Sequence, residues 1–166
     1  MHGIIRLGCS NRAIQHYNIA TKKLKKNNVF STFLMLWDID SNKTELVLNG
    51  HKGSVNCLNF LNDYQLITGS SDKTIRMWDI RNPSSAIHNI KSHSSKVKAI
   101  SIYNNLRMCT RDEDSICLWN LEGSNEPNLL TTINNLSPVE CLSIDDETML
   151  AGFSDGEVSY YDFNSK

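Results

Sequence analysis

The sequence has no long apolar run, and this absence excludes a membrane-spanning helix first. Asp, Lys or Asn interrupts every apolar stretch within a few residues, so none reaches the roughly 20 residues that such a helix needs. The first six residues also lack the basic-then-apolar layout of a secretory signal peptide. With 40% hydrophobic and 21% charged residues, the composition is that of a globular domain with a sizeable core. We therefore expect a protein of the cytoplasm, the nucleus or both.

Catalytic and cofactor-binding motifs are missing as well. The sequence contains no H-E-x-x-H, no G-x-x-x-x-G-K-[ST] and no G-x-S-x-G. Acidic triplets at residues 112–114 and 145–147 are candidate cation ligands, but both fall in expected hairpin turns, where Asp is common for backbone reasons. The sequence predicts no enzyme, no cofactor and no metal site.

The five cysteines form no C-x-x-C pair, which argues against a metal or disulfide role. Cys57, Cys109, Cys117 and Cys141 each fall inside an expected strand. Small buried thiols in a reducing compartment are the preferred interpretation.

Residues 50–81 contain a regular pattern of short apolar runs. This stretch opens with Gly50-His51 and closes with Trp78-Asp79. Between these marks, short runs at residues 55–60, 65–69 and 74–78 are apolar or alternate apolar with polar residues, with turn residues between them. Such runs predict strands joined by hairpin turns.

The closing mark recurs along the chain. Aromatic residues followed by Asp or Asn stand at Trp37, Trp78, Trp119 and Tyr161, which are 41, 41 and 42 residues apart. A period of about 40 to 45 residues with Gly-His and Trp-Asp marks is typical of WD-repeat propeller blades. The chain therefore resembles the WD-repeat (WD40) β-propeller family over residues 33–163. The resemblance implies an all-β fold, an incomplete β-propeller of four-stranded antiparallel blades, about three to four in number.

The repeat divides the chain, and we expect a single WD-repeat domain over residues 1–166. Residues 1–32 form a truncated blade fragment and a basic loop, and the successive repeats are 33–80, 81–121 and 122–163. Residues 7–19 align without a gap on residues 68–80, yet Tyr17 and Trp37 are only 20 residues apart, about half a repeat. Either a blade is truncated here, or a piece of a longer ancestral sequence has been lost.

An incomplete ring has consequences for association. Three complete blades plus fragments are fewer than the four to eight blades of closed propellers. An open arc exposes apolar sheet faces and unpaired strand edges, which invite association. We expect the chain to pair with a second copy, to complete a ring with another protein, or to be a truncated product of low stability.

The resemblance also implies a buried polar network in each blade. Carried over by position, its members in the first complete repeat are His51, Ser70, Asp72 and Trp78. Buried carboxylate and imidazole groups need partners, so such a network fixes the turn above it. A catalytic His–Asp pair is the weaker interpretation, because no nucleophile stands at matching spacing.

The later repeats depart from this pattern. By position, Arg111 replaces Ser70 and Glu113 replaces Asp72 in the next repeat. In the last repeat Phe153 and Tyr161 replace Ser and Trp. We expect those two blades to be less rigid than the first.

The implied function is that of a non-catalytic protein–protein interaction scaffold. In this family, loops at the top face bind partners. On this chain the expected partner-binding surface is Lys52, Ser54, Ser71, Lys73, Ser94, Lys96, Asp112 and Asp114. Charge is uneven: residues 1–53 carry a net +5 and residues 54–166 a net −6, a polarity able to steer a partner.

Two alternatives stay open. Residues 66–81 are similar to the box by which some WD-repeat proteins dock onto the adaptor of a cullin-RING ubiquitin ligase, with Asp79 and Arg81 as possible adaptor contacts. The plainer interpretation is that Arg81 pairs with Asp79 or with solvent. A remote alternative is nucleic-acid binding through the lysines of residues 22–26, which more often form a solvated loop. No membrane partner is expected.

Overall fold

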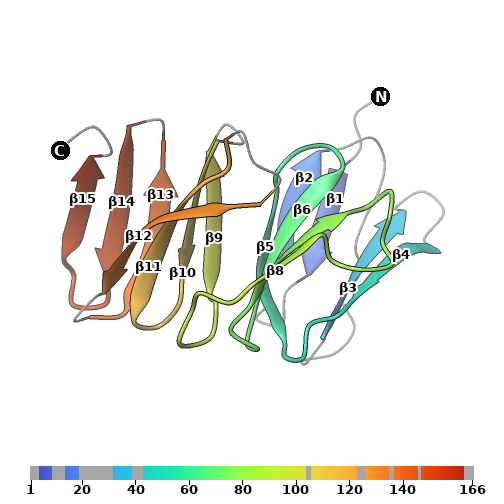
Figure 1. The fold of residues 1–166 in the computed structure, drawn as a ribbon, viewed down its shortest axis with the longest axis horizontal. Coiled ribbons are helices and arrows are strands. Elements are labelled where there is room, and N and C mark those ends of the chain that lie inside the picture. Colours follow the sequence, from blue (N-terminus) through green and yellow to red (C-terminus); the bar gives the residue numbers. More distant parts are fainter. Residues whose placement is uncertain are drawn as a thin grey trace.

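The computed structural model describes residues 4–8, 14–18, 32–38, 43–103, 106–122, 126–134, 137–145 and 147–162. The regular elements of these residues are β-strands (Figure 1). No helix in this part of the chain is long and apolar enough to cross a membrane. The all-β fold predicted from the sequence is confirmed.

The described strands are numbered in chain order. They are β1 Ile4–Gly8, β2 Ile14–Asn18, β3 Phe33–Asp38, β4 Lys43–Asn49, β5 Val55–Phe60, β6 Gln65–Ser70, β7 Ile75–Asp79, β8 His88–Ile90, β9 Ala99–Tyr103, β10 Arg107–Arg111, β11 Ser115–Asn120, β12 Asn128–Asn134, β13 Val139–Ile144, β14 Thr148–Phe153 and β15 Val158–Asp162. They form five sheets with the orders β1-β2, β3-β4, β5-β6-β7-β8, β9-β10-β11-β12 and β13-β14-β15. All pairings are antiparallel.

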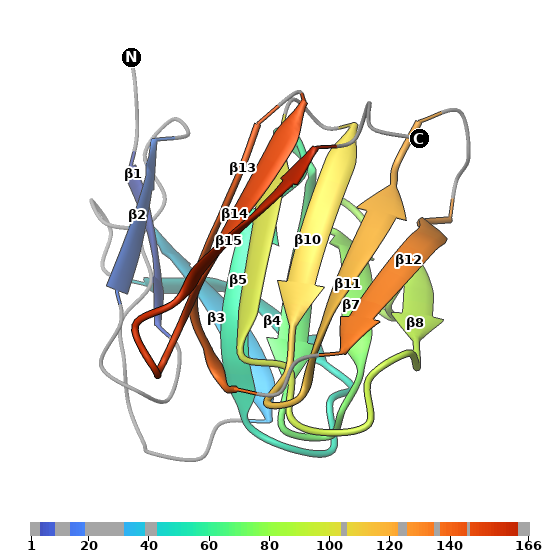
Figure 2. The same ribbon diagram turned by 90° about the vertical axis from the view of Figure 1, so that its left-hand side faces the viewer.

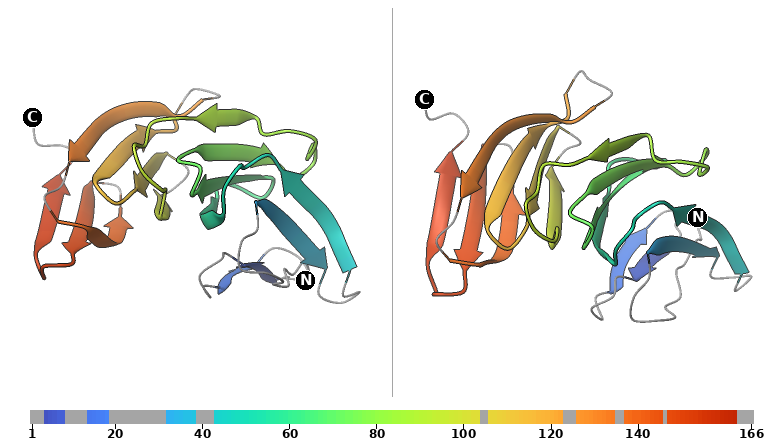
Figure 3. Two further views of the ribbon diagram at one scale, coloured as in Figure 1. Left: turned by 90° about the horizontal axis from the view of Figure 1, so that it is seen from below. Right: turned by 60° about the horizontal axis from the view of Figure 1, so that its bottom comes forward.

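The sheets follow one another along an arc. The C-terminal sheet lies at one end, and the sheets β1-β2 and β3-β4 lie at the other (Figure 1). The view turned by 90° looks along the arc from the side of the sheet β13-β14-β15 (Figure 2), and the view from below shows the curvature of the arc (Figure 3). From blade to blade, β5 contacts β9 and β9 contacts β13. The molecule is an incomplete propeller.

In the two four-stranded sheets, the outermost strand comes from the next sequence repeat. β8 pairs with β7 and β12 pairs with β11, because each follows its partner through a single turn or loop and folds back antiparallel. Among the described residues two sheets have four strands and the last has three. The sequence analysis assigned each four-stranded blade to one repeat, whereas in the structure the repeat boundaries cut through the sheets, because β8 and β12 join the preceding repeat.

Apolar side chains fill the space between consecutive sheets. One buried cluster joins β3-β4 to the blade β5–β8: Leu34, Leu48, Leu58, Phe60, Leu66 and Trp78. A second joins β5–β8 to β9–β12: Ile67, Ile75, Met77, Val97, Ile100, Met108, Cys117 and Trp119. A third joins β9–β12 to β13–β15: Cys109, Ile116, Leu118, Val139, Met149 and Ala151. The blades β5–β8 and β9–β12 thus use both faces, as strand alternation allows.

Candidate interaction surface and the polar networks beneath it

A buried histidine connects three segments of the blade β5–β8. His51 Nδ1 lies 2.9 Å from Asp72 Oδ2, and its Nε2 lies 2.7 Å from the Thr68 hydroxyl. The indole N–H of Trp78 donates to the same hydroxyl at 2.8 Å. One threonine oxygen therefore joins the imidazole to the indole.

The protonation state of this network follows from its burial. Burial lowers the pKa of His51 below 6.5 by more than the hydrogen bond and charge of Asp72 raise it. A neutral imidazole donates from Nδ1 to Asp72 and accepts at Nε2 from the hydroxyl of Thr68, which in turn accepts from Trp78. Each polar group of the set is satisfied, which is the condition for a stable buried network.

Asp72 carries the negative charge of the set and fixes two loops. Its carboxylate accepts from the Thr74 hydroxyl at 2.6 Å, from the Thr74 amide at 3.0 Å and from the Lys52 amide at 2.7 Å. Partial burial alone would raise the pKa of Asp72. These hydrogen bonds and the one from His51 outweigh that effect and lower the pKa to about 2. The carboxylate thus ties residues 51–52 to the β6–β7 turn.

Sequence reasoning chose Ser70 for this network and missed Thr68. The Ser70 hydroxyl donates to the Gly53 carbonyl at 3.0 Å and accepts from the Asp72 amide at 3.1 Å, so it braces the turn rather than the His51–Trp78 link. Period-two alternation places Thr68 and Ser70 on the same face of β6. The strand register distinguishes Thr68 from Ser70 as the partner of Trp78. Leu66 pairs with Trp78, and Thr68 is the next residue on that face of β6.

The same network recurs in the blade β9–β12. His93 Nδ1 lies 3.1 Å from Asp112 Oδ2, and its Nε2 lies 2.8 Å from the Thr110 hydroxyl. The Trp119 indole donates to that hydroxyl at 2.9 Å. Burial lowers the pKa of His93 despite the charge of Asp112. For Asp112, burial raises the pKa, but hydrogen bonds such as those from the Asp114 and Ser115 amides bring it to about 2.

This finding corrects two predictions. Asp112, not Glu113, takes the role of Asp72, because the turn is one residue shorter and alignment from the tryptophan slips by one position. Asp112 is also fully buried, so it does not belong to the partner-binding surface. Arg111 instead donates to the carbonyls of Val139 and Glu140 in the next blade.

The blade β13–β15 is built differently. Met149 pairs with Tyr161 as Leu66 pairs with Trp78, so Ala151 stands where Thr68 stands. Asp155 is exposed and accepts from the Ser137 hydroxyl and, at 3.0 Å, from the Glu157 amide. An open cavity of about 350 Å³ lies here, lined by Asn134, Ser137, Phe153, Asp155, Glu157, Ser159 and Tyr161. The expectation of lower rigidity in this blade stays a prediction.

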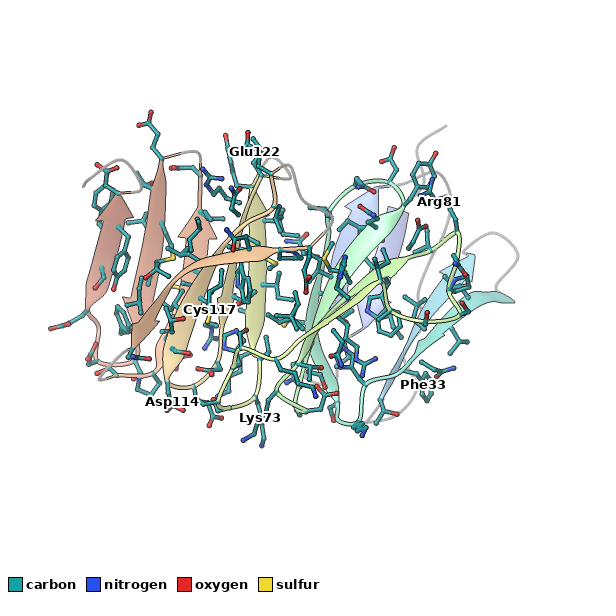
Figure 4. The ribbon with its side chains drawn as sticks, in the orientation of Figure 1. Phe33, Lys73, Arg81, Asp114, Cys117 and Glu122 are labelled. Carbon is teal, nitrogen blue, oxygen red and sulfur yellow. The ribbon has the colours of Figure 1, made fainter. Side chains whose placement is uncertain are left out.

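The remaining residues of the predicted partner-binding surface lie on loops that the first two networks fix. We call this set the loop surface: Lys52, Ser54, Ser71, Lys73, Ser94, Lys96 and Asp114. Ser54 and Ser71 are partly exposed and the others are exposed. Figure 4 shows Lys73 and Asp114 at the same edge of the molecule.

Hydrogen bonds between blades hold this surface together. The Val97 amide donates to the Ser70 carbonyl at 3.1 Å, and the Asn56 side chain donates to the Val97 carbonyl at 2.8 Å. Within the first blade, the Ser71 amide donates to the Ser54 carbonyl at 2.8 Å. The loops of two blades therefore form one connected surface.

Exposed cations dominate one part of the loop surface. Among the described residues, no carboxylate forms an ion pair with the side chain of Lys52, Lys73 or Lys96. By contrast, Lys98 pairs with Glu113 at 3.0 Å. The three lysines are free to bind an external anion.

Arg81 lies at the opposite edge from Lys73 (Figure 4). Its guanidinium donates to both carboxylate oxygens of Asp79, at 2.9 and 2.6 Å, and lies 4.6 Å from the centre of the Tyr64 ring. Hydrogen bonds from Arg81 hold the pKa of Asp79 at about 2. The side chain of Arg81 is nevertheless 62% exposed, so its outer surface is open to a partner.

Other candidate sites receive less support. No group of three or more potential metal ligands occurs among the described residues. Of the cysteines expected to be buried, Cys109 and Cys117 are, Cys57 is half-buried, and Cys141 is exposed because it lies on the outer side of the last sheet. The lysines at 22–26, proposed for nucleic acid, lie outside the described residues.

Comparison with known proteins identifies a family model and a curated relative that match this chain. A family model described as "WD domain, G-beta repeat" matches residues 42–79. An F-box/WD repeat-containing protein A-like protein from Dictyostelium discoideum is 69% identical over 226 aligned residues, covering 100% of this chain and 19% of that protein. The chain therefore spans about a fifth of the length of this relative. The aligned stretch is 60 residues longer than the 166 of this chain, so the relative has sequence here that the chain lacks.

Proposed function

We propose, on the premise that this chain is a WD-repeat protein, that it is a non-catalytic scaffold whose loop surface binds an acidic segment of a protein partner. Three lysines on connected loops, none of them in an ion pair with a carboxylate of the described residues, provide the positive charge. Charged groups on such a surface speed encounter with an oppositely charged partner and select against like-charged ones.

The observation that carries the proposal is the support under these lysines. The Lys52 amide and the turn that bears Lys73 are both tied to Asp72, which the buried His51 holds from below. A surface that is already ordered loses little conformational entropy when a partner binds. Function resides in this surface and not in the fold, which many unrelated activities share.

The relative adds a hypothesis about context. Its name combines WD repeats with an F-box, which suggests a ubiquitin-ligase link for that protein. In such an arrangement the WD repeats would hold the protein that the ligase modifies. For this chain, we propose that role for the loop surface.

Affinity capture with two charge-reversal variants tests the scaffold. The tagged full chain and its Lys52→Glu/Lys73→Glu/Lys96→Glu variant are compared by quantitative mass spectrometry of bound proteins. Arg81→Glu is the matched control, since it reverses a cation at the opposite edge. We expect the triple variant to lose at least about 90% of its partners, because each lost charge pair at an interface weakens binding several-fold. Equal capture by both variants would contradict the proposal.

A second candidate function is docking onto a ligase adaptor through Asp79 and Arg81. The exposed side chain of Arg81 favours this candidate, since its outer surface stays open while it donates to Asp79. Here the same variants give the reverse pattern: Arg81→Glu abolishes pull-down of the adaptor of a cullin-RING ligase, and the triple lysine variant retains it. Normal pull-down by Arg81→Glu would dismiss this candidate.

A further inference from the structure

The open cavity of the blade β13–β15 lies where the blade β5–β8 has its polar network. The backbone of the last turn is the same in both blades: the Phe153 amide donates to the Glu157 carbonyl at 2.9 Å, and the Ser70 amide donates to the Thr74 carbonyl at 3.2 Å. The next amide along the chain also donates across the sheet in both blades, at 2.9 and 2.8 Å. The residues around the cavity can therefore be matched by position with those of the first blade.

In the blade β5–β8, two side chains with N–H donors occupy this space. The His51 imidazole lies 2.9 Å from the Asp72 carboxylate, and its centre lies 6.1 Å from that of the Trp78 ring. The guanidinium carbon of Arg76 lies 5.9 Å from the centre of the same ring. The guanidinium also approaches the backbone, because a Cβ on Gly50 would lie only 2.5 Å from its Nη1. The first blade thus places an imidazole and a guanidinium beside a carboxylate and an aromatic ring.

The last blade keeps the carboxylate and an aromatic ring but not the arginine. Asp155 matches Asp72, Tyr161 matches the tryptophan, and Ser159 stands where the first blade has its arginine. The histidine position falls in the sequence on Asn135, which lies outside the described residues. Asp155, Ser159 and Tyr161 all line the cavity of about 350 Å³. The cavity therefore lies beside the position from which the first blade extends a long basic side chain and the last blade only a serine.

A second carboxylate lines the cavity. Glu157 stands where the first blade has Thr74. Among the residues that the structure describes, no cation forms an ion pair with Glu157 or Asp155. The hydrogen bonds from the Ser137 hydroxyl and the Glu157 amide lower the pKa of Asp155, so its carboxylate is charged at neutral pH. Arg111, which reaches this blade from β10, donates to main-chain carbonyls and does not line the cavity.

A guanidinium cation matches this combination of groups. Its planar fork donates to carboxylate oxygens at two points, and its flat face stacks on aromatic rings. Phe153 and Tyr161 supply such rings in the lining of the cavity. A metal ion matches less well, since it needs several oxygen ligands and the described residues contain no group of three or more potential ligands. The volume is at the lower end of the roughly 300–1,000 Å³ that is typical of ligand pockets.

We propose that the cavity of β13–β15 binds the guanidinium group of an arginine residue of a protein partner. The cation takes the place that Arg76 fills in the first blade, with Asp155 and Glu157 as acceptors and Tyr161 as the ring on which it stacks. The cavity is open, so a side chain of another chain can enter it. This site is separate from the loop surface and selects a basic ligand, whereas the loop surface selects an acidic one.

Calorimetry with capped amino acids is the first test. The full chain is titrated with Nα-acetylarginine methylamide and with the matching citrulline compound, which has nearly the same shape but no charge. Citrulline should bind at least about tenfold more weakly, because hydrogen bonds to ionised groups are the strong ones. The lysine compound should also bind more weakly than arginine, because an ammonium lacks the planar fork. Equal affinities for arginine and citrulline would overturn the proposal, and so would no binding of arginine at millimolar concentrations.

A matched pair of variants locates the site. Glu157→Gln removes one charge from the cavity with little change of shape, and it should raise the dissociation constant of capped arginine at least about fivefold, because a charge-assisted hydrogen bond becomes a neutral one. Glu147→Gln is the control, since Glu147 is equally exposed but lies at the other end of the same sheet. Near-ultraviolet circular dichroism shows whether each variant is folded. Equal dissociation constants for both variants would overturn the assignment.

An arginine built into the blade gives an independent test. Ser159→Arg restores the residue that the first blade has at this position, and it should occupy the cavity and abolish binding of capped arginine. Ser143→Arg is the control: Leu142 and Ile144 pack toward β9–β12, so alternation turns the exposed Ser143 to the opposite face. Unchanged binding by a folded Ser159→Arg variant would overturn the proposal.

Free arginine tests the source of the cation. Residues 137–162 contain seven Asp and Glu residues and no Lys or Arg, so they repel the carboxylate of the free amino acid. An arginine residue of a protein has no such carboxylate, and capped arginine should therefore bind more tightly than free arginine. Tighter binding of free arginine would overturn the assignment to a protein partner. The triple lysine variant of the loop surface should still bind capped arginine, which separates the two sites.

Discussion

The blades β5–β8 and β13–β15 are built from two copies of the same type of sequence repeat, and they differ in what surrounds them. In the first, His51, Thr68 and Trp78 form a closed chain of hydrogen bonds, and another sheet covers each face. In the last, Ala151 and Tyr161 replace the threonine and the tryptophan, and one face is exposed. The hydroxyl and the indole are lost together, so no buried donor is left without its acceptor.

The buried network therefore occurs in the two blades that support the loop surface. His51 and His93 lie under the loops that carry Lys52, Lys73 and Lys96, and both hold a turn carboxylate. The last blade lacks this support, and its Asp155 is exposed.

Removing the shared hydroxyl should give the largest effect. Thr68→Val is nearly isosteric but leaves the His51 Nε2 and the Trp78 N–H unpaired in the core. We expect a loss of about 2 to 4 kcal/mol in the free energy of unfolding, since each unpaired buried group costs roughly 1–3 kcal/mol. Urea denaturation measures it, and Thr110→Val should behave alike. Thr68→Ser, which keeps the hydroxyl, is the control; an equal loss with serine would show that the hydrogen bonds are not the cause.

Two equivalent glycines should respond unequally to alanine. A Cβ on Gly69 would lie 2.5 Å from Val97 Cγ1 of the next blade and 2.7 Å from Cys57 Sγ, whereas on Gly152 it would meet only Cys141 Sγ, at 2.7 Å. Gly69→Ala should cost about 1–3 kcal/mol through overpacking. Gly152→Ala should cost clearly less, because the exposed Cys141 side chain can move. Equal urea midpoints for the two variants would show that the neighbouring blade does not restrict Gly69.

The neutral buried histidines should make stability depend on pH. Burial holds the pKa values of His51 and His93 in the folded protein below the ordinary histidine value of 6.5, so unfolding takes up protons as the pH falls through 6.5. The free energy of unfolding should therefore decrease between pH 7.5 and 5.5, by at most about 1.4 kcal/mol per pH unit per histidine. Asp72 and Asp112, at about 2, keep their contribution in this range. Urea midpoints that stay level or rise on acidification would contradict neutral histidines.

The smallest effect should come from the exposed ion pair. Arg81→Ala removes the contacts to Asp79 and Tyr64 at the edge opposite the loop surface. Because such pairs are screened by solvent, the urea midpoint should not move measurably. A large decrease would mean that Arg81 supports the blade, and loss of adaptor binding by its variants would then not demonstrate a contact.

Much of the fold follows from the sequence because the period is strong. The Trp78-Asp79 and Gly50-His51 marks predicted the all-β blades, and alternation predicted the strands around them. The pairing of β12 with β11 did not follow, since a repeat read from the sequence does not say which neighbour its first strand joins. The role of Asp112 was also missed. The turn before β11 is shorter by one residue, which shifts the alignment of this repeat on the first one, and the amino-acid composition does not reveal such a shift.

The half-repeat spacing near the start can be set beside the relative. Tyr17 and Trp37 are 20 residues apart, and the aligned stretch of the relative exceeds this chain by 60 residues. If those 60 residues lay between Tyr17 and Trp37, the spacing would be 80, close to two repeats of 41, as the loss of an internal piece predicts. The strand pairs β1-β2 and β3-β4 fit that interpretation, since each has the strands of half a blade.

Amide hydrogen exchange tests the contrast between the blades most directly. The amides of β6 and β10 should exchange far more slowly than those of β14 and β15, because local opening is easiest where a sheet has an exposed apolar face. If β14 were as protected as β6, the contrast between the blades would not exist and the account would be wrong.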